Sequence, residues 1–203
     1  IVEVVSIAAY KARLPEGSIQ LIEHTDREAV QVMFTLNDYL DVLIPRGGAG
    51  LIKAVVNNST VPVIQTGVGN CHTYVDSDAD LDKAEQIVIN AKTQRTGVCN
   101  AMETLLVNEE VAEEFLPKMD KELHQLDTVV KGDDRVQELV PNVEEATEED
   151  WATEFLDYIL AVKVVEDLDE ALAHIDQYST SHSEAIVTEN YTKAQQFLEL
   201  VDS

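Results

Sequence analysis

The sequence is poor in basic residues and in long apolar runs, and each shortage excludes a class of protein. Lys and Arg together number 14 against 39 Asp and Glu, which gives a formal net charge of −25. A chain so acidic repels phosphate backbones and anionic lipid, so we expect neither nucleic acid nor a membrane among its partners. No apolar stretch approaches the ~20 residues that a bilayer-spanning helix needs.

Cysteine is also scarce. The two cysteines, Cys71 and Cys99, are too few for a disulfide framework in a chain of 203 residues. With no signal-peptide pattern at the first residues, this predicts a reducing compartment, the cytoplasm. His72 follows Cys71, but no second Cys/His pair follows at ligand spacing, so we expect no metal site.

What the chain does have is an alternation of short apolar runs and helical patterns. In its first third the patterns predict helices over 2–12, 26–36 and 51–56, and strands over 19–22, 41–45 and 61–64. Further on they predict helices over 78–94, 109–126, 168–178 and 191–201, and strands over 103–107, 128–130, 160–165 and 185–188. This alternation predicts parallel, doubly wound α/β sheets. The acidic cluster at 144–150 is expected to be a solvated loop.

Cys99 stands where a helical pattern ends at Gly97 and before the strand at 103–107. A thiol held at a break between elements can be approached by a substrate, so Cys99 is a candidate nucleophile. The alternative is a small core residue, since free cysteine is among the most buried residue types. The residues by themselves leave both interpretations open.

Arg46, Gly47 and Gly48 lie between the strand predicted at 41–45 and the helix predicted at 51–56. Backbone N–H groups and the helix dipole at such a place favour a bound phosphate. The loop matches neither the dinucleotide fingerprint nor the P-loop, and a tight turn without a ligand is an equal alternative. Arg46 could then pair with one of the many acids.

Five segments carry a resemblance to a known family, in collinear order over nearly the whole chain. They are Asp41–Gly48, Gly69–His72, Asn90–Arg95, Val98–Val107 and His182–Thr188. Together they resemble the gamma-glutamyl phosphate reductases, a family within the aldehyde dehydrogenase superfamily. The resemblance implies an aldehyde-dehydrogenase-like α/β fold. It also implies NADPH-dependent reduction of a small-molecule substrate, L-glutamyl 5-phosphate, to L-glutamate 5-semialdehyde and phosphate in proline biosynthesis.

The resemblance also implies roles for particular residues. Cys99 falls at the family's nucleophile, Cys71 becomes the structural cysteine, and Asn100 with the Cys99 N–H is a candidate for holding the oxyanion. The cofactor contacts implied are Arg46, Gly47 and Gly48 for the phosphates and Glu154 for the nicotinamide ribose.

The implied domains are residues 1–70, part of the NADPH-binding domain, and residues 71–203, a catalytic domain truncated at its C-terminus. We expect the chain to continue at both ends, into segments that in the family include oligomerisation elements, so a homo-oligomer is among the implied assemblies. A hypothesis of another class is a non-catalytic acidic α/β domain that binds a nucleotide or a partner without turnover.

Overall fold

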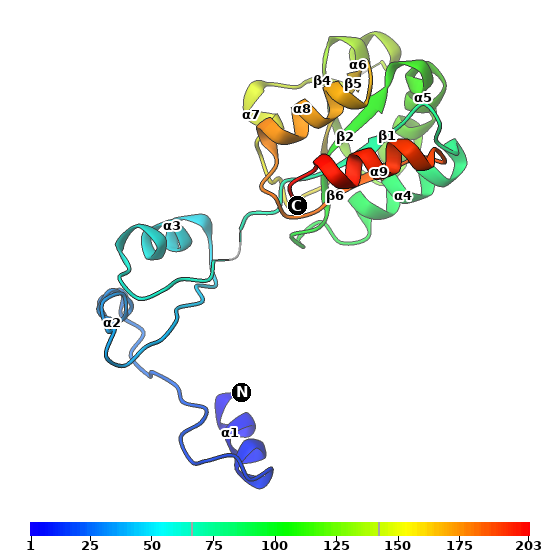
Figure 1. The fold of residues 1–203 in the computed structure, drawn as a ribbon. Coiled ribbons are helices and arrows are strands. Elements are labelled where there is room, and N and C mark those ends of the chain that lie inside the picture. The colour runs from blue at the N-terminus through cyan, green and yellow to red at the C-terminus, as the bar shows by residue number, and fades with distance from the viewer. Residues whose placement is uncertain (66, 142) are drawn as a thin grey trace. The chain divides into compact units, whose positions relative to one another are not determined.

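The computed structural model describes residues 1–65, 67–141 and 143–203 and divides the chain into two compact units (Figure 1). They are Ile1–Thr66 and Gly67–Ser203, whereas the sequence predicts a boundary after residue 70. Within the described ranges, no helix combines the length and the apolar character that a bilayer crossing requires.

The larger unit, Gly67–Ser203, is built on one six-stranded parallel sheet in the order β4-β3-β5-β2-β1-β6 (Figure 1). Its strands are β1 (Cys71–Val75), β2 (Met102–Asn108), β3 (Val129–Gly132), β4 (Glu144–Glu145), β5 (Ile159–Val165) and β6 (Glu184–Val187). Its helices are α4 (Leu81–Thr93), α5 (Glu109–Gln125), α6 (Asp134–Leu139), α7 (Glu148–Trp151), α8 (Leu168–Tyr178) and α9 (Tyr191–Leu200). A helix connects each strand to the next, as parallel pairing requires. The predicted α/β alternation of this part of the chain is therefore confirmed.

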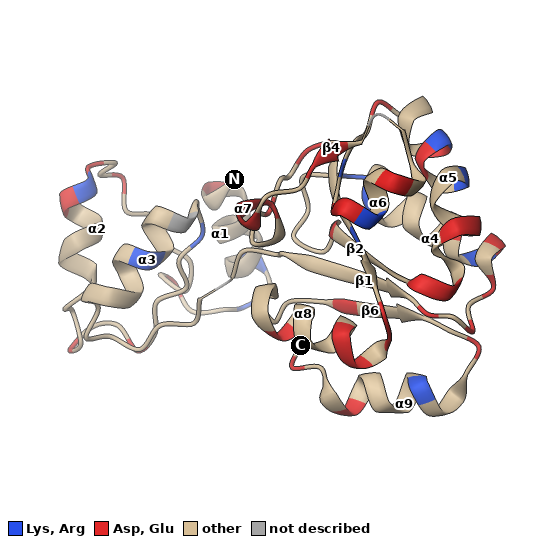
Figure 2. Cartoon of the chain, turned by 90° about the horizontal axis from the view of Figure 1, so that it is seen from above, with Lys and Arg blue, Asp and Glu red and all other residues tan. Residues whose placement is uncertain are grey.

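Both faces of the sheet are covered by helices (Figure 2). Leu105 and Val107 of β2 belong to the core cluster that includes Val88 of α4 and Phe115 of α5. Leu106, between them, packs with α8 and α9 on the opposite face, because successive side chains of a strand point to opposite sides. All three side chains of β2 are fully buried. Burial on both faces explains why Leu105, Leu106 and Val107 are consecutive apolar residues in this strand.

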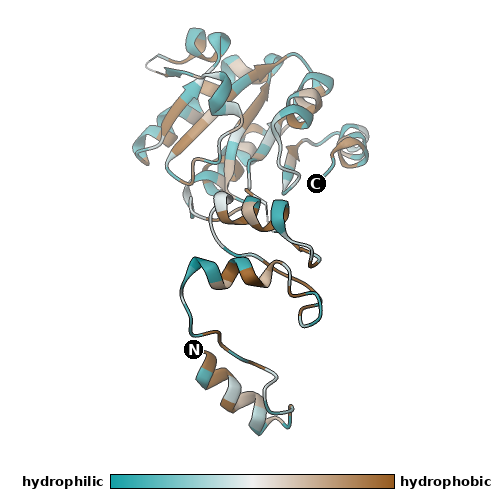
Figure 3. Ribbon diagram, turned by 90° about the vertical axis from the view of Figure 1, so that its left-hand side faces the viewer, coloured by the Kyte–Doolittle hydropathy of each residue, from teal (hydrophilic) through white to brown (hydrophobic). Residues whose placement is uncertain are grey.

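Acidic and amide side chains begin most helices of the larger unit. The N-cap side chains of α4, α5, α6, α8 and α9 accept backbone N–H groups of the first turn; they are Asp80, Asn108, Asp133, Asp167 and Asn190. These bonds satisfy donors that a helix start leaves without partners. Part of the acid content is therefore structural, and other acids are spread over helices and loops (Figure 2). Hydrophilic residues, in teal, occupy much of the helices, whereas the strands are mainly hydrophobic, in brown (Figure 3).

The acidic segment at 144–150 is not the loop that its composition predicts, although Glu144, Glu145, Glu148 and Glu149 are exposed to solvent as expected. It contributes β4, which pairs with β3, and the start of α7. Thr147 and Asp150 form a capping box at that helix. Asp150 is buried, and its carboxylate pairs with the Lys131 ammonium at 2.7 Å. The prediction was wrong about the loop and about Asp150, because composition does not reveal that a carboxylate will meet a cation from a distant strand.

The smaller unit, Ile1–Thr66, contains three helices in its described residues: α1 (Val2–Lys11), α2 (Arg27–Met33) and α3 (Ala49–Asn58). The helices predicted over 2–12, 26–36 and 51–56 are thus confirmed as elements, with shifted ends. Phe34, Val55 and Val61 form its small set of buried apolar side chains.

The strands predicted over 19–22, 41–45 and 61–64 do not form among the described residues of the smaller unit. Leu43 and Val63 make an isolated parallel bridge instead. Strands need neighbours to propagate, and a single bridge between two segments is not a stable sheet. Ile44 and Ile64 accordingly remain 63% and 59% exposed. The apolar composition of these segments was correctly recognised, but the prediction of strands was wrong for this chain.

A fully buried ion pair joins α4 to β2. Lys92 Nζ lies 2.6 Å from Glu103 Oε2, and neither side chain is exposed. The second carboxylate oxygen accepts the N–H of Leu156 at 3.2 Å. Burial raises the pKa of Glu103 and lowers the pKa of Lys92, because loss of water disfavours each charged form, and their mutual hydrogen bond opposes both shifts. The pair anchors the beginning of β2, directly after the turn that carries Cys99.

We expect Glu103→Leu to lower the free energy of unfolding by about 3–5 kcal/mol, because the Lys92 ammonium would remain buried without its partner. Adding Lys92→Met should recover most of that loss, since no buried charge then remains. Urea unfolding of the full-length protein measures both effects.

The matched control is Glu189→Leu, at an ion pair with Lys83 whose side chains are 62% and 61% exposed. It should cost about 1 kcal/mol or less, because exposed ion pairs contribute little. Equal losses for the Glu103 and Glu189 variants would contradict the prediction.

Candidate active site

The cysteines, His72 and Glu184 of the larger unit lie where the strands β1, β2 and β6 begin. Cys71 and Glu184 are the first residues of β1 and β6. In the parallel register Cys71 pairs with Met102, the first residue of β2, and His72 pairs with Glu184. The turn that carries Cys99 leads directly into β2. The candidate site therefore lies at the amino-terminal edge of the sheet, not at the carboxyl edge usual for open α/β sheets.

Cys99 lies in a tight turn between α4 and β2. The N–H of Ala101 donates to the carbonyl of Val98 at 3.0 Å and closes the turn around Cys99 and Asn100. The Cys99 thiol and the Asn100 side chain are both exposed. A thiol in this setting is open to a small molecule, which favours the nucleophile over the core residue.

Gly69 holds the cysteine turn in place by a close backbone contact. A Cβ atom built on Gly69 would lie 1.7 Å from the carbonyl oxygen of Cys99. No side chain fits there, so the segment before β1 can cross the turn at this distance only as glycine. The Gly69 N–H in turn donates to Glu154 Oε1 at 2.8 Å. Glu154 and Cys99 thus both contact one short stretch of backbone.

Cys71 has the opposite environment to Cys99. It is buried, and its thiol donates to the Cys99 carbonyl oxygen at 3.2 Å. Burial, with the nearby Glu184 carboxylate adding to it, raises the pKa of the Cys71 thiol to about 12. The thiol stays protonated near neutral pH, so Cys71 supports the turn and is a poor nucleophile.

A buried hydrogen-bonded group lies next to Cys71. Glu184 Oε2 accepts the His72 N–H at 2.6 Å and lies 3.0 Å from His72 Nδ1, while Ser179 donates to the other carboxylate oxygen. The His72 and Glu184 side chains are fully buried. Sequence reasoning assigned no role to this group, since nothing in the pattern distinguishes the acid that opens β6 from solvated acids.

Arg46, Gly47 and Gly48 belong to the smaller unit. Arg46 and both glycines are exposed, and Gly48 is the N-cap of α3, with its carbonyl accepting the N–H of Leu51 at 3.0 Å. Nothing lies within 4 Å of a Cβ built on Gly48, so the space beside this backbone is open to a ligand. The structure thus brings Cys99, Asn100 and Glu154 together within the larger unit and places the Arg46 loop in the smaller one.

No group of three or more His, Cys, Asp or Glu side chains in the described part of the chain is arranged to hold a metal ion.

The profile of the aldehyde dehydrogenase family matches residues 2–155. The chain therefore belongs to the aldehyde dehydrogenase family. Among curated relatives, the gamma-glutamyl phosphate reductase of Moorella thermoacetica is 62% identical over 200 residues, which cover 98% of this chain and 48% of that protein. That of Clostridium novyi is 62% identical over 203 residues, 100% of this chain and 49% of the relative. The chain thus spans about half the length of the curated relatives it matches.

Solved structures agree with this assignment. The crystal structure of gamma-glutamyl phosphate reductase from Thermotoga maritima has 52% identity and a TM-score of 0.95, covering 100% of this chain and 49% of that one. An acetylating aldehyde dehydrogenase from Geobacillus thermoglucosidasius, at 22% identity, has a TM-score of 0.71 over 97% of this chain and 52% of its own. The second likeness shows the shared fold and nothing more specific.

We expect Gly69→Ala to displace the cysteine turn, because its methyl group would overlap the Cys99 carbonyl oxygen. Relief of the overlap should cost about 1–3 kcal/mol of stability and change the rate at which Cys99 reacts with an alkylating reagent. Urea unfolding and thiol labelling of the full-length protein measure the two effects.

Gly97→Ala is the control, because nothing lies within 4 Å of a Cβ at Gly97 in the same connection. Its stability should stay within about 0.5 kcal/mol of wild type. If Gly69→Ala were as mild as Gly97→Ala, the close contact would not constrain the turn.

Proposed function

We propose that the protein containing this chain reduces L-glutamyl 5-phosphate to L-glutamate 5-semialdehyde and phosphate, using NADPH, in proline biosynthesis. The supporting observation is the combination of relatives of that name, 62% identical along this chain, with an exposed cysteine in a turn at Cys99.

Cys99 is the proposed nucleophile. Its thiolate attacks the carbonyl carbon of the acyl phosphate, phosphate leaves as a stable anion, and a thioester to Cys99 remains. The nicotinamide cofactor, when bound, supplies the hydride that reduces this thioester to the aldehyde and releases the thiol. The protein contributes placement of the sulfur, through the Gly69 contact and the Cys71 hydrogen bond beneath the turn.

Asn100 and the backbone N–H of Cys99 are the proposed donors to the oxyanion that forms on the attacked carbonyl. Among the described residues, neither group donates a hydrogen bond to the protein. Donors that are already oriented and need not break another bond stabilise developing negative charge best. Their position in the same turn as the sulfur supports this role.

Arg46, Gly47, Gly48 and Glu154 are the proposed cofactor contacts. The open space beside Gly48 and the exposed Arg46 fit the phosphates of a nicotinamide dinucleotide. Glu154 uses Oε1 to hold the Gly69 N–H, which leaves its second oxygen to accept a ribose hydroxyl.

Cys99→Ser should abolish reduction of the acyl phosphate by the full-length protein while leaving the fold and cofactor binding intact. A hydroxyl has a much higher pKa than a thiol and cannot replace the thiolate near neutral pH. Steady-state rates, circular dichroism and cofactor titration test the three parts.

Cys71→Ser is the matched control and should keep most activity, because a serine hydroxyl can still donate to the Cys99 carbonyl. More than trace activity in Cys99→Ser would refute the proposal. If both thiols were inert to labelling and unaffected by substrate analogue, the data would favour the non-catalytic binding domain.

Arg46→Ala should raise the KM for NADPH about 10-fold, because a charge-assisted contact to a phosphate is lost, and should change kcat little. The KM of the variant should also depend less on salt than that of wild type. Lys53→Ala, which removes an exposed cation from α3 of the same unit, is the control. An unchanged KM in Arg46→Ala would return Arg46 to a structural role.

A further inference from the structure

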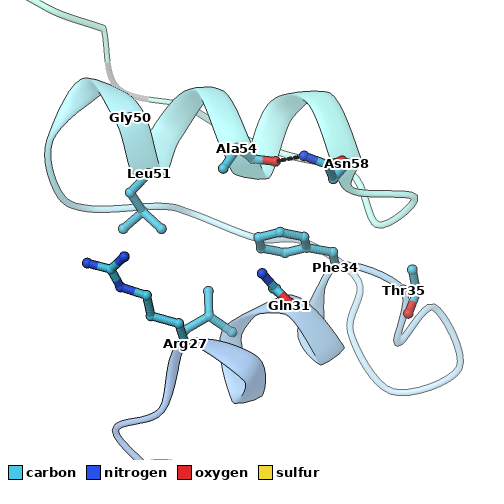
Figure 4. A pocket seen from close by; sticks show the side chains of 9 residues that line it. Arg27, Gln31, Phe34, Thr35, Gly50, Leu51, Ala54 and Asn58 are labelled. Carbon is cyan, nitrogen blue, oxygen red and sulfur yellow. Dashed lines mark hydrogen bonds between the residues drawn. The ribbon is translucent and has the colours of Figure 1, made fainter.

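The cavity between α2 and α3 of the smaller unit (Figure 4) is lined by Gly50 and Leu51, which directly follow the glycine loop proposed to hold the cofactor phosphates. It therefore belongs with the proposed cofactor site. The larger unit, in contrast, contains two charged side chains, Lys92 and Glu103, that are fully buried and have no part in the proposed chemistry. Lys92 lies in the last turn of α4 and Glu103 is the second residue of β2, so the two stand on either side of the turn that carries Cys99.

The Lys92–Glu103 pair closes the segment 93–102 at its base. Lys92 Nζ and Glu103 Oε2 lie 2.6 Å apart, and this contact joins the end of α4 to the start of β2. Removing two charges from water is costly, and an apolar pair of similar volume often stabilises a protein equally well. Stability alone therefore does not account for a buried ion pair here, whereas its directional bonds hold the two ends of the cysteine segment in one arrangement.

The second carboxylate oxygen of Glu103 holds the segment that follows Glu154. Glu103 Oε1 accepts the N–H of Leu156 at 3.2 Å. Leu156 has a φ of 54°, in the left-handed region that residues with a side chain rarely adopt. Leu156 is also 46% exposed, so packing of its side chain compensates little for the unfavourable backbone conformation. Such conformations persist where the surrounding structure imposes them, and at this position the bond from Leu156 to Glu103 does so.

Lys92 contacts the same segment. Its Nζ lies 5.9 Å from the centroid of the Phe155 ring, within range for a cation–π interaction. Glu154, immediately before Phe155, accepts the N–H of Gly69, whose backbone crosses the cysteine turn. The Glu154 segment and the Cys99 turn are thus tied together twice, once through Gly69 and once through the buried pair.

We propose that Glu103 is a positioning residue: its two carboxylate oxygens hold the Glu154 segment and the Cys99 turn in the alignment that hydride transfer requires. In the proposed reaction the hydride moves between the nicotinamide, whose ribose Glu154 is proposed to hold, and the carbon bonded to the Cys99 sulfur. A displacement of about 1 Å between two such groups can slow a reaction about 100-fold. This inference rests on the proposed function, because the transfer that Glu103 aligns is a step of that reaction.

The test follows one turnover of the full-length protein in the reverse direction. L-glutamate 5-semialdehyde and saturating NADP⁺ are mixed with the protein in phosphate-free buffer, and the burst of NADPH absorbance is recorded by stopped flow. The amplitude of the burst counts the folded, active sites, and its rate reports hydride transfer from the Cys99 adduct. A residue that contributes only to folding changes the amplitude, whereas a positioning residue changes the rate.

Two double variants remove the buried charge and differ in whether the Leu156 N–H keeps an acceptor. The variant with Lys92→Met and Glu103→Leu offers none, and it should slow the burst about 10- to 100-fold at an amplitude close to that of wild type. The variant with Lys92→Met and Glu103→Gln retains an amide oxygen and should stay within about threefold of the wild-type rate. Glu103→Asp keeps the charge beside Lys92 but is one carbon shorter and cannot reach both partners, so it should slow the burst as well.

Glu189→Leu, at the exposed pair with Lys83, is the control and should change neither the rate nor the amplitude. Equal burst rates in the two double variants, or a loss confined to the amplitude, would overturn the positioning role of Glu103 while leaving the cysteine chemistry untouched. The absence of a burst in wild type would overturn the proposed function together with this inference, so the two failures are distinguishable.

Discussion

The close approach of the Gly69 backbone to the Cys99 carbonyl is the contact on which the candidate active site depends. With 1.7 Å between that oxygen and a Cβ on Gly69, the crossing tolerates no side chain. The same backbone stretch binds Glu154, and Cys71, just beyond it, donates to the turn from below. The buried Lys92–Glu103 pair fixes the strand that follows. The Cys99 turn and Glu154 are thus positioned by one set of backbone contacts.

The two cysteines show how environment decides the chemistry of identical side chains. Cys99 is exposed in a turn, whereas Cys71 is buried with a pKa of about 12. The two thiols differ chemically because burial disfavours the thiolate form and exposure to solvent permits it. The buried Cys71 thiol also supports the turn that carries Cys99, through its hydrogen bond to the Cys99 carbonyl oxygen.

The acidic residues of the larger unit and the arginine at the glycine loop of the smaller unit have different surroundings. In the larger unit, acids cap helices and pair with lysines: Asp80 caps α4, and Asp150 pairs with the half-buried Lys131. In the smaller unit, the exposed Arg46 stands at a glycine loop with open space beside Gly48. The local charge at this loop can therefore differ in sign from the net charge of the chain, and local charge governs interactions at short range.

The sequence by itself determined the elements whose signals are local. The bounds of β2 and of the amphipathic helix α8 were predicted to within one residue. A strand buried on both faces gives consecutive apolar residues, and a helix buried along one stripe gives apolar residues at helical spacing, so both patterns can be recognised in the sequence. Tertiary structure decided the rest. The segment at 41–45 is as apolar as a buried strand, but among the described residues it forms only an isolated bridge from Leu43 to Val63. Asp150 is buried where its carboxylate meets Lys131. The strand pairing of the segment at 41–45 and the burial of Asp150 both depend on residues far away in the sequence, and a local sequence pattern carries no information about such residues.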